Sequence, residues 1–600
     1  HRSDRCTPVG PVHDILKHMK YSIRRQLSNE ELTKLATFPP LVAHLLFHRG
    51  ISDGNAAEKF MVPDYERDTH DPLLLQDAGK AAARIIQAIK NDEKTVIYAD
   101  YDADGIPGAV IFDQLFKKIG FKNYFVYIPH RHDEGFGLNE DAVLEFAEQG
   151  VKLAITIDCG ITDKTALELA FGKGIDIIVT DHHEQPEAGL PPAYAVVDPK
   201  RNDCAYPDKN ICGAGVAYKL IQAVLGVDSF GIKKGWEKWL LDMVGVATLS
   251  DMVPLTGENR VFSHYGLQVL RKSPRKGLNE LLGKLRISKK HLTEDDIGFM
   301  ITPRINAASR MGVPMDAFNL LSAENDILAA KYAERLDAVN NERKAAVAVL
   351  VKEVKRTIRE RYGENITAVI VLGNPVWRPS LLGLAANTCA AEFNRPVFLW
   401  GRDGGNIIKG SCRSEGRTNV VELMRAVPGG VFSQFGGHKH SGGFAVSNDQ
   451  VYFLEKHLNE ADEKTKNQKP KIKNSEQESG LGEEDFIDAE LALGAVDWEL
   501  YEDISKLAPF GKDNPKPVFL FRNVMPAEVR RFGKGKEHIG VDFKRLNGSR
   551  LSAISFFGAE NEWAGEIKTG KPIDMIASLE KSIFRGKIEL RLRIFDIISL

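Results

Sequence analysis

The chain of 600 residues lacks several features that mark particular classes of protein. No apolar run approaches the roughly 18–20 residues of a membrane-spanning helix. The first residues do not have the basic, apolar and small-residue order of a secretory signal peptide. The six cysteines are scattered without a CxxC pair, which favours reduced thiols in a cytoplasmic protein. A zinc site at Cys204 and Cys212 stays open as the less favoured alternative.

An excess of either charge is also absent, because the formal net charge is −2. The whole protein is therefore not a polycation, and any contact with nucleic acid must use local basic patches. The chain begins with His1 rather than a methionine, so we expect the native N-terminus to be missing or processed. The length exceeds what one hydrophobic core supports, so we expect about two to four domains.

Helix and strand patterns alternate after a helical lead-in at 1–75. Short buried strands are predicted at 95–99, 124–128, 153–157 and 175–179. This alternation predicts an α/β domain over 76–265, with a parallel sheet covered by helices on both faces. A helical connector follows at 266–364. It contains a charged stretch without Gly or Pro at 326–361, which predicts one long exposed helix that bridges two domains.

The rest of the chain divides around a polar segment. Residues 365–460 are predicted to form a second, smaller α/β domain. Residues 461–485 are charged and almost free of large apolar side chains, which predicts a linker. Residues 486–600 show strand alternation and many turn glycines, which favour a small β-barrel such as an OB-fold.

Acidic and histidine residues come directly after four predicted buried strands. They are the segment DYDADG at 100–105, Asp158, the segment DHH at 181–183, and Asp251 after the apolar run 243–250. Ligands bind at this edge of open α/β sheets. Taken singly, each segment is more often a helix cap or a turn. Crowded carboxylates repel one another unless cations separate them, so the four together predict a centre for two Mn²⁺ or Mg²⁺ ions.

In the same order, the motifs DYDADG, IDCGI, TDHH and LSDMVP resemble the four motifs of the DHH phosphoesterases. The flanking stretches PHRHDEGFGLN (129–139) and TPRINAASR (302–310) resemble the RecJ family of single-stranded-DNA-specific exonucleases in particular. The resemblance runs from about residue 30 to the C-terminus. It implies a DHH domain, a DHHA1 domain and a C-terminal OB-fold that binds nucleic acid.

Carried over to this chain, the resemblance implies the metal ligands Asp102, Asp104, Asp158, His182 and Asp251. Asp158 would be shared by both ions and act in catalysis, beside His183 at the scissile phosphate. Asp181 would orient a neighbouring imidazole, and Asp100 is either a further ligand or a support for the turn. One departure is Ile106-Pro107-Gly108, where the family motif continues with a Thr or Ser that supplies a hydroxyl contact.

Glycine-rich segments at 410–414 and 436–443 resemble the DHHA1 domain, which in this family binds the terminal nucleotide and its 5′ phosphate. Such loops are otherwise ordinary turns, but glycine allows close backbone approach and arginine grips phosphate. The implied phosphate-binding residues are Ser411, Arg413, Gly436, Gly437 and His438. Two departures are Arg378 in place of a usual histidine, and Lys439-His440-Ser441 in place of small or apolar residues.

Two further segments are candidates for substrate contact. Arg304, Asn306 and Arg310 are predicted to lie on a phosphate-contacting loop, with a capped turn between helices as the alternative. In the predicted barrel, basic and aromatic residues interleave, which suits a single strand, although such a run is otherwise a solvated face. These residues are Arg530, Arg531, Phe532, Lys534, Lys536, Phe543, Lys544 and Arg545.

The resemblance implies a two-metal exonuclease that degrades single-stranded DNA from the 5′ end to mononucleotides in recombination and repair. We expect a monomer, with a helicase and a single-strand-binding protein as candidate partners. One alternative is hydrolysis of short oligonucleotides or cyclic dinucleotides, as in smaller proteins with the same two domains. Another is a non-catalytic scaffold, against which the complete ligand set argues. The sequence leaves open Mn²⁺ against Mg²⁺, and activity on RNA.

Overall fold

The computed structural model describes residues 21–402, 407–416, 418–468, 486–584 and 587–599. The chain divides into two compact units. The larger unit comprises His70–Val253 and Tyr265–Gln477. The smaller unit joins His1–Thr69 and Pro254–His264 with Glu478–Leu600. The lead-in therefore belongs with the C-terminal part of the chain, which no local pattern in the sequence could indicate.

An all-parallel sheet forms the centre of the first part of the larger unit. Its strand order is β3-β2-β4-β5-β6. The strands are β2 Thr95–Ala99, β3 Tyr124–Tyr127, β4 Leu153–Ile157, β5 Asp176–Thr180 and β6 Ala195–Val197. β2 and β4 are buried along their whole length, as expected for strands covered on both faces. The parallel sheet predicted from the sequence is therefore confirmed.

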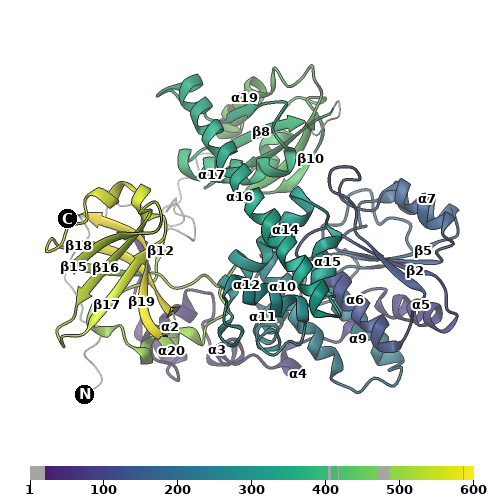
Figure 1. The fold of residues 1–600 in the computed structure, drawn as a ribbon, viewed down its shortest axis with the longest axis horizontal. Helices are drawn as coiled ribbons and strands as arrows, with labels where there is room; N and C mark the ends of the chain where they lie inside the picture. The colour runs from purple at the N-terminus through teal and green to yellow at the C-terminus, as the bar shows by residue number, and fades with distance from the viewer. Residues whose placement is uncertain (1–20, 403–406, 417, 469–485, 585–586, 600) are drawn as a thin grey trace. The chain divides into compact units, whose positions relative to one another are not determined.

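Helices cover both faces of this sheet. They are α5 Ala78–Lys90, α6 Gly105–Ile119, α7 Glu140–Glu148, α8 Lys164–Gly172 and α9 Gly213–Val227. α7 lies on one face, whereas α5, α6 and α9 lie on the other (Figure 1). β2 and β4 are neighbours although β3 lies between them in the chain. The chain thus leaves β2 toward opposite edges, and such switch points bind ligands at the carboxyl ends of the strands.

The expected fourth strand, which would have preceded Asp251, is a helix. α10 spans Leu241–Ser250, and Asp251 is its C-cap. Because α10 is buried from Leu241 to Thr248 on all sides, it shows no polar face that would mark it as a helix. The connector continues with α11 Gly257–Leu270, α12 Lys276–Leu285, α13 Glu294–Asp296, α14 Thr302–Met311 and α15 Met315–Leu321.

The long charged helix exists as α16 Asp326–Tyr362. It is not an exposed bridge, because both halves bury one apolar face. Ala329, Ala333 and Leu336 are buried in the first half. In the second half Leu350, Val354 and Ile358 share a core with α17 Pro379–Phe393. The charged residues occupy the remaining positions. The composition of the segment therefore does not reveal its apolar face.

A mixed sheet follows α16, with strand order β10-β11-β9-β8-β7. Its elements are β7 Ile370–Gly373, β8 Val397–Arg402, β9 Ile408–Arg413, β10 Phe432–His438 and β11 Ser441–Val446, with α18 Val420–Arg425 and α19 Leu454–Gln468. The expected linker at 461–485 is wrong at its start, because α19 continues to Gln468. Leu454, Leu458 and Ala461 repeat at helical spacing and are buried, which extends the helix. Residues 469–485 lie outside the described residues.

The smaller unit contains a sheet of order β13-β14-β18-β19-β17-β16-β15. The strands are β13 Ala489–Glu490, β14 Phe519–Val524, β15 Pro526–Phe532, β16 His538–Lys544, β17 Arg550–Ser555, β18 Ile573–Phe584 and β19 Lys587–Ser599, with α20 Trp498–Ser505 between β13 and β14. The strand-rich C-terminal domain predicted from the sequence is confirmed.

The lead-in consists of short helices, as the sequence predicts for its described part. They are α1 Asn29–Lys34, α2 Pro40–Phe47, α3 Gly54–Met61 and α4 Tyr65–Asp68. Leu45 and Leu46 share one core with Phe519 and Phe521 of β14. β1 Ser22–Ile23 also pairs in parallel with β12 Phe486–Ile487. Within the described residues of the whole chain, none of the helices is both long and apolar enough to span a bilayer.

Candidate metal centre and substrate-binding residues

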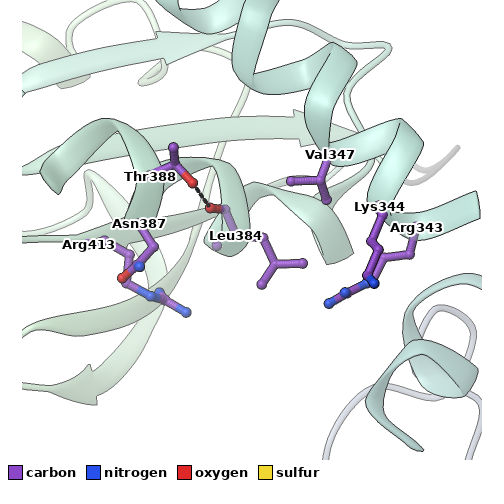
Figure 2. Close-up of a pocket in the computed structure, with 8 residues that line it drawn as sticks. Arg343, Lys344, Val347, Leu384, Asn387, Thr388 and Arg413 are labelled. Carbon is purple, nitrogen blue, oxygen red and sulfur yellow. Dashed lines mark hydrogen bonds between the residues drawn. The ribbon is translucent and has the colours of Figure 1, made fainter. Parts of the chain in front are cut away.

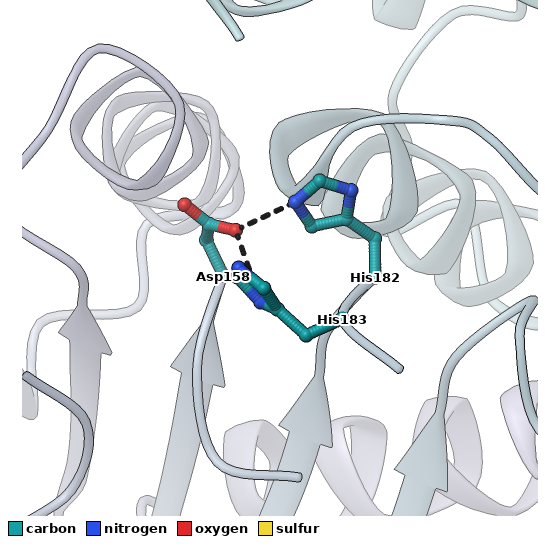
Figure 3. A group of neighbouring side chains, drawn as sticks. All are labelled: Asp158, His182 and His183. Atoms are coloured by element: carbon teal, nitrogen blue, oxygen red, sulfur yellow. Dashed lines mark ion pairs between the residues drawn. The ribbon is translucent and has the colours of Figure 1, made fainter. Parts of the chain in front are cut away.

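The acidic and histidine motifs converge at the carboxyl ends of the parallel strands. Asp158 follows β4, and His182 and His183 follow β5 (Figure 3). His182 Nε2 lies 3.1 Å from Asp158 Oδ1, and His183 Nδ1 lies 4.0 Å from the same oxygen. Asp158 has a φ of 60°, a left-handed conformation that is uncommon for a residue with a side chain. Strain of this kind is concentrated at functional sites.

Three overlapping groups have ligand atoms that all lie within 4.8 Å of one another. The groups are Asp100, Asp102 and Asp158; Asp104, His182 and Asp251; and Asp158, His182 and His183. Asp158 and His182 each belong to two groups, so the side chains offer two adjacent metal positions. Asp251 arrives from the end of α10 rather than from a strand, yet its carboxylate lies 3.7 Å from His182 Nε2. Asp100, uncertain from the sequence, lies inside the cluster.

The carboxylates are buried close together. Burial and the neighbouring carboxylates raise the pKa of Asp104 to about 7 and that of Asp251 to about 8. Both causes also raise the pKa of Asp100 and of Asp158. The buried oxygens Asp100 Oδ1 and Asp158 Oδ1 accept no hydrogen bond within the described structure. Hard divalent cations would coordinate both oxygens and offset the repulsion between the neighbouring carboxylates. This donor set therefore fits Mn²⁺ or Mg²⁺.

Asp181 holds the histidine segment. One of its oxygens accepts the backbone N–H groups of His182 at 2.8 Å and His183 at 3.2 Å, and lies 2.7 Å from His183 Nδ1. Burial opposes protonation of His183, but the hydrogen bond and charge of Asp181 raise its pKa to about 9. Burial and the charge of His183 lower the pKa of His182 to about 3. The neutral His182 is thus suited to metal ligation.

The N-terminus of α9 is part of the site and was missed from the sequence. The two carboxylate oxygens of Asp104 accept the backbone N–H groups of Gly213 and Ala214, each at 2.7 Å. A Cβ on Gly213 would lie 2.6 Å from the Cβ of Asp158, so only glycine fits there. The available signal was a glycine at the start of the mostly apolar stretch 213–227. It indicates that a backbone or a ligand approaches closely.

The departure at Ile106-Pro107-Gly108 leaves the local structure intact. Pro107 lies in the first turn of α6, where a missing N–H is tolerated. A Cβ on Gly108 would lie 2.5 Å from Ile157 of β4, so this glycine lets α6 approach the sheet. A Cβ on Gly105 would lie 2.4 Å from the carbonyl oxygen of Asp100, so the sharp turn of the acidic loop also requires glycine.

The segment with Arg304 and Asn306 is a helix, α14, and not the expected loop. Arg304 forms an ion pair of 2.8 Å with Asp337 of α16, so its charge is engaged within the protein. Asn306 accepts the backbone N–H of Ala103 at 2.9 Å through its side-chain oxygen. Asn306 therefore fixes the acidic loop. The packing of α14 along α16 explains why this segment is helical.

Arg310 lies at the end of α14, among other cations. Its guanidinium donates to the carbonyl of Ser380 at 2.9 Å. Burial and the positive charges of Arg131, Arg343 and Arg413 lower the pKa of Arg310 to about 10. Cations that repel one another at this range form a natural place for a polyanion. A role of Arg310 in phosphate binding remains a prediction.

The glycine-rich segments of the second sheet are adjacent strands rather than loops. β9 carries Ser411 and Arg413, and β10 and β11 form a hairpin in which Gly436 pairs with Gly443. A Cβ on Gly437, whose φ is 140°, would lie 2.3 Å from the carbonyl oxygen of Ser441. A Cβ on Gly436 would meet nothing within 4 Å, so internal packing does not require a glycine there.

His438 is exposed to solvent, whereas Arg378 lies close to another helix. His438 is exposed where β10 ends, before the turn at Lys439 and His440. Arg378 occupies the N-cap position of α17 without a side-chain capping hydrogen bond, and its guanidinium lies 3.9 Å from the sulfur of Met311. The departures at Arg378 and at Lys439-His440-Ser441 are thus accommodated at a helix start and in a hairpin turn.

The basic run of the barrel lies partly in internal contacts. Arg530 pairs with Asp542, and Arg531 donates to the carbonyl of Ala564 at 3.2 Å. Phe543 is fully buried, so the expectation that it is an interleaved stacking residue is wrong. β16 is buried continuously from Ile539 to Phe543, and Phe543 fills the core. Lys534 and Lys536 are exposed and keep their place as candidates.

A different aromatic cluster of the barrel is exposed; we call it the aromatic patch. It consists of Phe532, His538, Phe556, Phe557, Arg591 and Arg593. Phe557 is 65% exposed at a φ of 59°, and its N–H donates to His538 Nδ1 at 3.1 Å. The Arg593 guanidinium lies 4.5 Å from the ring centre of Phe556. An exposed aromatic residue held in a strained conformation beside cations is a platform suited to an unpaired base.

The zinc alternative finds no support among the described residues. Cys204 and Cys212 are buried and form no disulfide. The described groups that could hold a metal ion contain no cysteine. Cys6 lies outside the described residues.

Comparison with known proteins reproduces the domain order. Residues 94–248 match the model of the DHH family N-terminal domain, residues 363–467 the DHHA1 domain, and residues 487–596 the RecJ OB domain. The single-stranded-DNA-specific exonuclease RecJ of Bacillus subtilis (strain 168) is 33% identical over 96% of this chain and 70% of its own length. Its counterpart from Escherichia coli (strain K12) is 27% identical over 96% of this chain and 98% of its own length.

Solved structures share the fold. The crystal structure of RecJ in complex with Mn²⁺ from Thermus thermophilus matches with a TM-score of 0.75 at 24% identity, covering 96% of this chain and 79% of that one. A crystal structure of exonuclease RecJ bound to manganese matches with a TM-score of 0.56 at 29% identity, over 66% of this chain and 96% of that one.

The fold, the carboxylate cluster and the matched domain models define a phosphoesterase of the DHH class with a DHHA1 domain. Within that class, the chain belongs to the RecJ family.

Proposed function

We propose that the chain is a metal-dependent exonuclease that hydrolyses single-stranded DNA from the 5′ end and releases 5′-mononucleotides in recombination and repair. The observation that carries this proposal is the cluster of buried carboxylates and histidines, in which Asp100 Oδ1 and Asp158 Oδ1 accept no hydrogen bond within the described structure. Its place at the switch point of a parallel sheet, in a chain of the RecJ family, supports the same assignment. The relatives are named as exonucleases specific for single-stranded DNA.

Two overlapping sets of side chains would hold the metal ions. Asp100, Asp102 and Asp158 would hold one ion, and Asp104, His182 and Asp251 the other, with Asp158 shared. Mn²⁺ and Mg²⁺ are both candidates, because RecJ structures from Thermus thermophilus contain each. When bound, such ions supply Lewis-acid activation of water and stabilise negative charge on the phosphoryl group.

The side chains around the ions position the reacting groups. Because Asp181 engages Nδ1 of His183, Nε2 is the nitrogen left to donate a hydrogen bond to the scissile phosphate or the leaving 3′ oxygen. Asn306 and the backbone at Gly213 keep the acidic loop in place. These contacts hold the carboxylates in their geometry before substrate binds, so that little reorganisation is needed during hydrolysis.

The second sheet would bind the strand end. Arg310 and Arg413 supply positive charge, and the backbone at Gly436 is open to a close approach. Together with Ser411, Gly437 and His438 they would hold the 5′ phosphate and thereby set polarity. The aromatic patch of the barrel would stack unpaired bases farther along the strand. A monomeric state, and cooperation with a helicase and a single-strand-binding protein, belong to the same proposal.

The test is a nuclease assay on single strands labelled at the 5′ or the 3′ end, with Mn²⁺ or with chelator. We expect a 5′ label to appear at once as mononucleotide, and a 3′ label to remain on progressively shorter strands. The variant Asp158→Asn should be inactive in both formats. If the 3′ label is released first, the proposed polarity is wrong. Turnover of a dinucleotide faster than that of a long strand would instead favour the oligonucleotide hydrolase.

A further inference from the structure

A cavity of about 490 Å³ lies between α16 and α17, beside β9. Its walls carry the cations Arg343 and Lys344 of α16 and Arg413 of β9, with Asn387 and Thr388 of α17 (Figure 2). The remaining lining residues are apolar or glycine, and the lining contains no carboxylate. Pockets of roughly 300–1,000 Å³ are the size that holds small ligands such as a nucleotide.

The positive charges in this cavity are only partly compensated within the described structure: Asp337 acts on Lys344, and Arg413 donates to the carbonyl of Cys412 at 2.8 Å. Arg343 Nε is buried and has no hydrogen-bond partner. Burial and the charge of Arg304 lower the pKa of Arg343, and burial with the charges of Arg304 and Arg343 lowers the pKa of Lys344. Arg304 itself is paired with Asp337, so its positive charge is compensated. An anion in the cavity would partner the orphan nitrogen and stabilise all three cations.

A glycine allows Arg413 to reach this cavity. A Cβ on Gly383 of α17 would lie 2.9 Å from Arg413 Nη2, so a side chain there would displace the guanidinium. The same α16 offers a contrast at its solvent face. There Lys352 and Arg356 are exposed, and Arg356 lies 3.7 Å from Glu360. Cations of this helix are therefore solvated or paired elsewhere, and unpaired at the cavity.

We propose that the cavity is a second phosphate-binding site, separate from the carboxylate cluster, in which Arg343 and Lys344 hold a phosphate group of a nucleotide. The side-chain amide N–H of Asn387 would add a neutral hydrogen bond. The choice of nucleotide as ligand rests on the proposed function. Two sources have this chemistry: an internucleotide phosphate of the bound strand, and the released 5′-mononucleotide, whose phosphate starts at Arg413.

The first test measures binding without hydrolysis, by calorimetry with dAMP and with a long dT strand in the absence of divalent metal. The variant Arg343→Gln/Lys344→Gln removes both α16 cations of the cavity. The control Lys352→Gln/Arg356→Gln removes the same charge from the solvent face of the same helix. Loss of charge-assisted hydrogen bonds should weaken binding of one ligand by about tenfold or more. The control should bind within about twofold of the wild type.

The two ligands separate the two sources. If the cavity holds a strand phosphate, the variant binds dT weakly, with a salt slope shallower by about 0.7 for each lost phosphate contact, and binds dAMP normally. If it holds the product, dAMP binding weakens, inhibition by dAMP is relieved, and dT binding is unchanged. Either result supports the site. Unchanged binding of both ligands, relative to the control pair, overturns it.

A second variant tests the same site in case the double substitution disrupts folding. Asn387→Asp places a carboxylate in the cavity wall at an exposed position with almost no change in shape. It should weaken binding of the same ligand that the double variant affects. Equal or tighter binding by Asn387→Asp would contradict an anion site. Because these measurements need no turnover, they remain decisive even if the chain fails to hydrolyse DNA, and so the two proposals can fail separately.

Discussion

The two sheets of the larger unit gather side chains of opposite charge. The parallel sheet gathers carboxylates at one edge and buries them, so that their pKa values rise. The mixed sheet and its helices gather arginines whose pKa values fall, because burial and like charge disfavour protonation. The first arrangement requires cations and the second requires anions. A phosphodiester with divalent ions supplies both.

A substitution in the carboxylate cluster should have the largest effect on activity. Asp158→Asn removes the carboxylate shared by two groups of ligands, and we expect hydrolysis to fall by about 10³-fold or more. Melting curves with and without Mn²⁺ supply a readout independent of activity. The ion should raise the Tm of the wild type through binding and leave the variant unchanged. An equal Mn²⁺-dependent shift in both proteins would remove Asp158 from the metal site.

A substitution among the arginines of the mixed sheet should affect substrate affinity rather than turnover. Arg413→Gln removes charge from the proposed phosphate site, so KM for a 5′-phosphorylated strand should rise by about 10–100-fold with kcat little changed. Arg425→Gln, at an exposed end of α18, is the matched control. A strand with a 5′ hydroxyl should show a smaller loss. A fall in kcat at constant KM would instead assign Arg413 to the hydrolytic step.

A smaller effect is expected at the barrel, outside both sheets. Phe557→Ala removes the exposed ring of the aromatic patch, and stacking of one base contributes about 1–3 kcal/mol. Binding of a dT strand, followed by fluorescence anisotropy, should weaken by about fivefold or more. Phe595→Ala is the control, because Phe595 is also exposed on β19 but does not belong to the aromatic patch. Equal effects of the two variants would exclude the patch.

The smallest effect concerns the stability cost of buried charge. Burial and the charge of Asp181 raise the pKa of Asp198 to about 8, and Asp198 Oδ2 has no hydrogen-bond partner within the described structure. A carboxyl with a raised folded pKa is most stabilising when protonated, so wild-type stability declines as pH rises from about 4 to about 8. Asp198→Asn should therefore raise the Tm by about 2–4 °C at pH 9 and by nearly nothing at pH 4. A gap that is the same at both pH values would contradict this.

The convergence of the acidic site could be predicted because its geometry follows from strand ends. Asp158 and His182 follow short apolar strands, and parallel strands bring such positions together. Asp251 joins them for a different reason than expected, since a helix that is buried all round resembles a strand in sequence. The N-terminus of α9 at Gly213 was missed, because its approach to Asp104 is set by tertiary packing.

The barrel was predicted less well than the sheet edge. Its strands follow from alternation, but alternation also decides which aromatic residue faces inward. Phe543 falls on the inner face of β16, whereas Phe556 and Phe557 follow the end of β17. Their exposure depends on the turn after the strand and on His538 from a neighbouring strand. Composition cannot distinguish these cases, because all three are phenylalanines.

The shared core of the lead-in and the barrel has a consequence for synthesis. Leu45 and Leu46 leave the ribosome more than four hundred residues before Phe519, with which they share one core. The helices of the lead-in must therefore wait, with their apolar faces uncovered, until the barrel has been translated. The larger unit has all its described elements between these two segments and can fold in the interval. A chain stopped before the barrel would expose the lead-in to aggregation, so the barrel also completes the core of the lead-in.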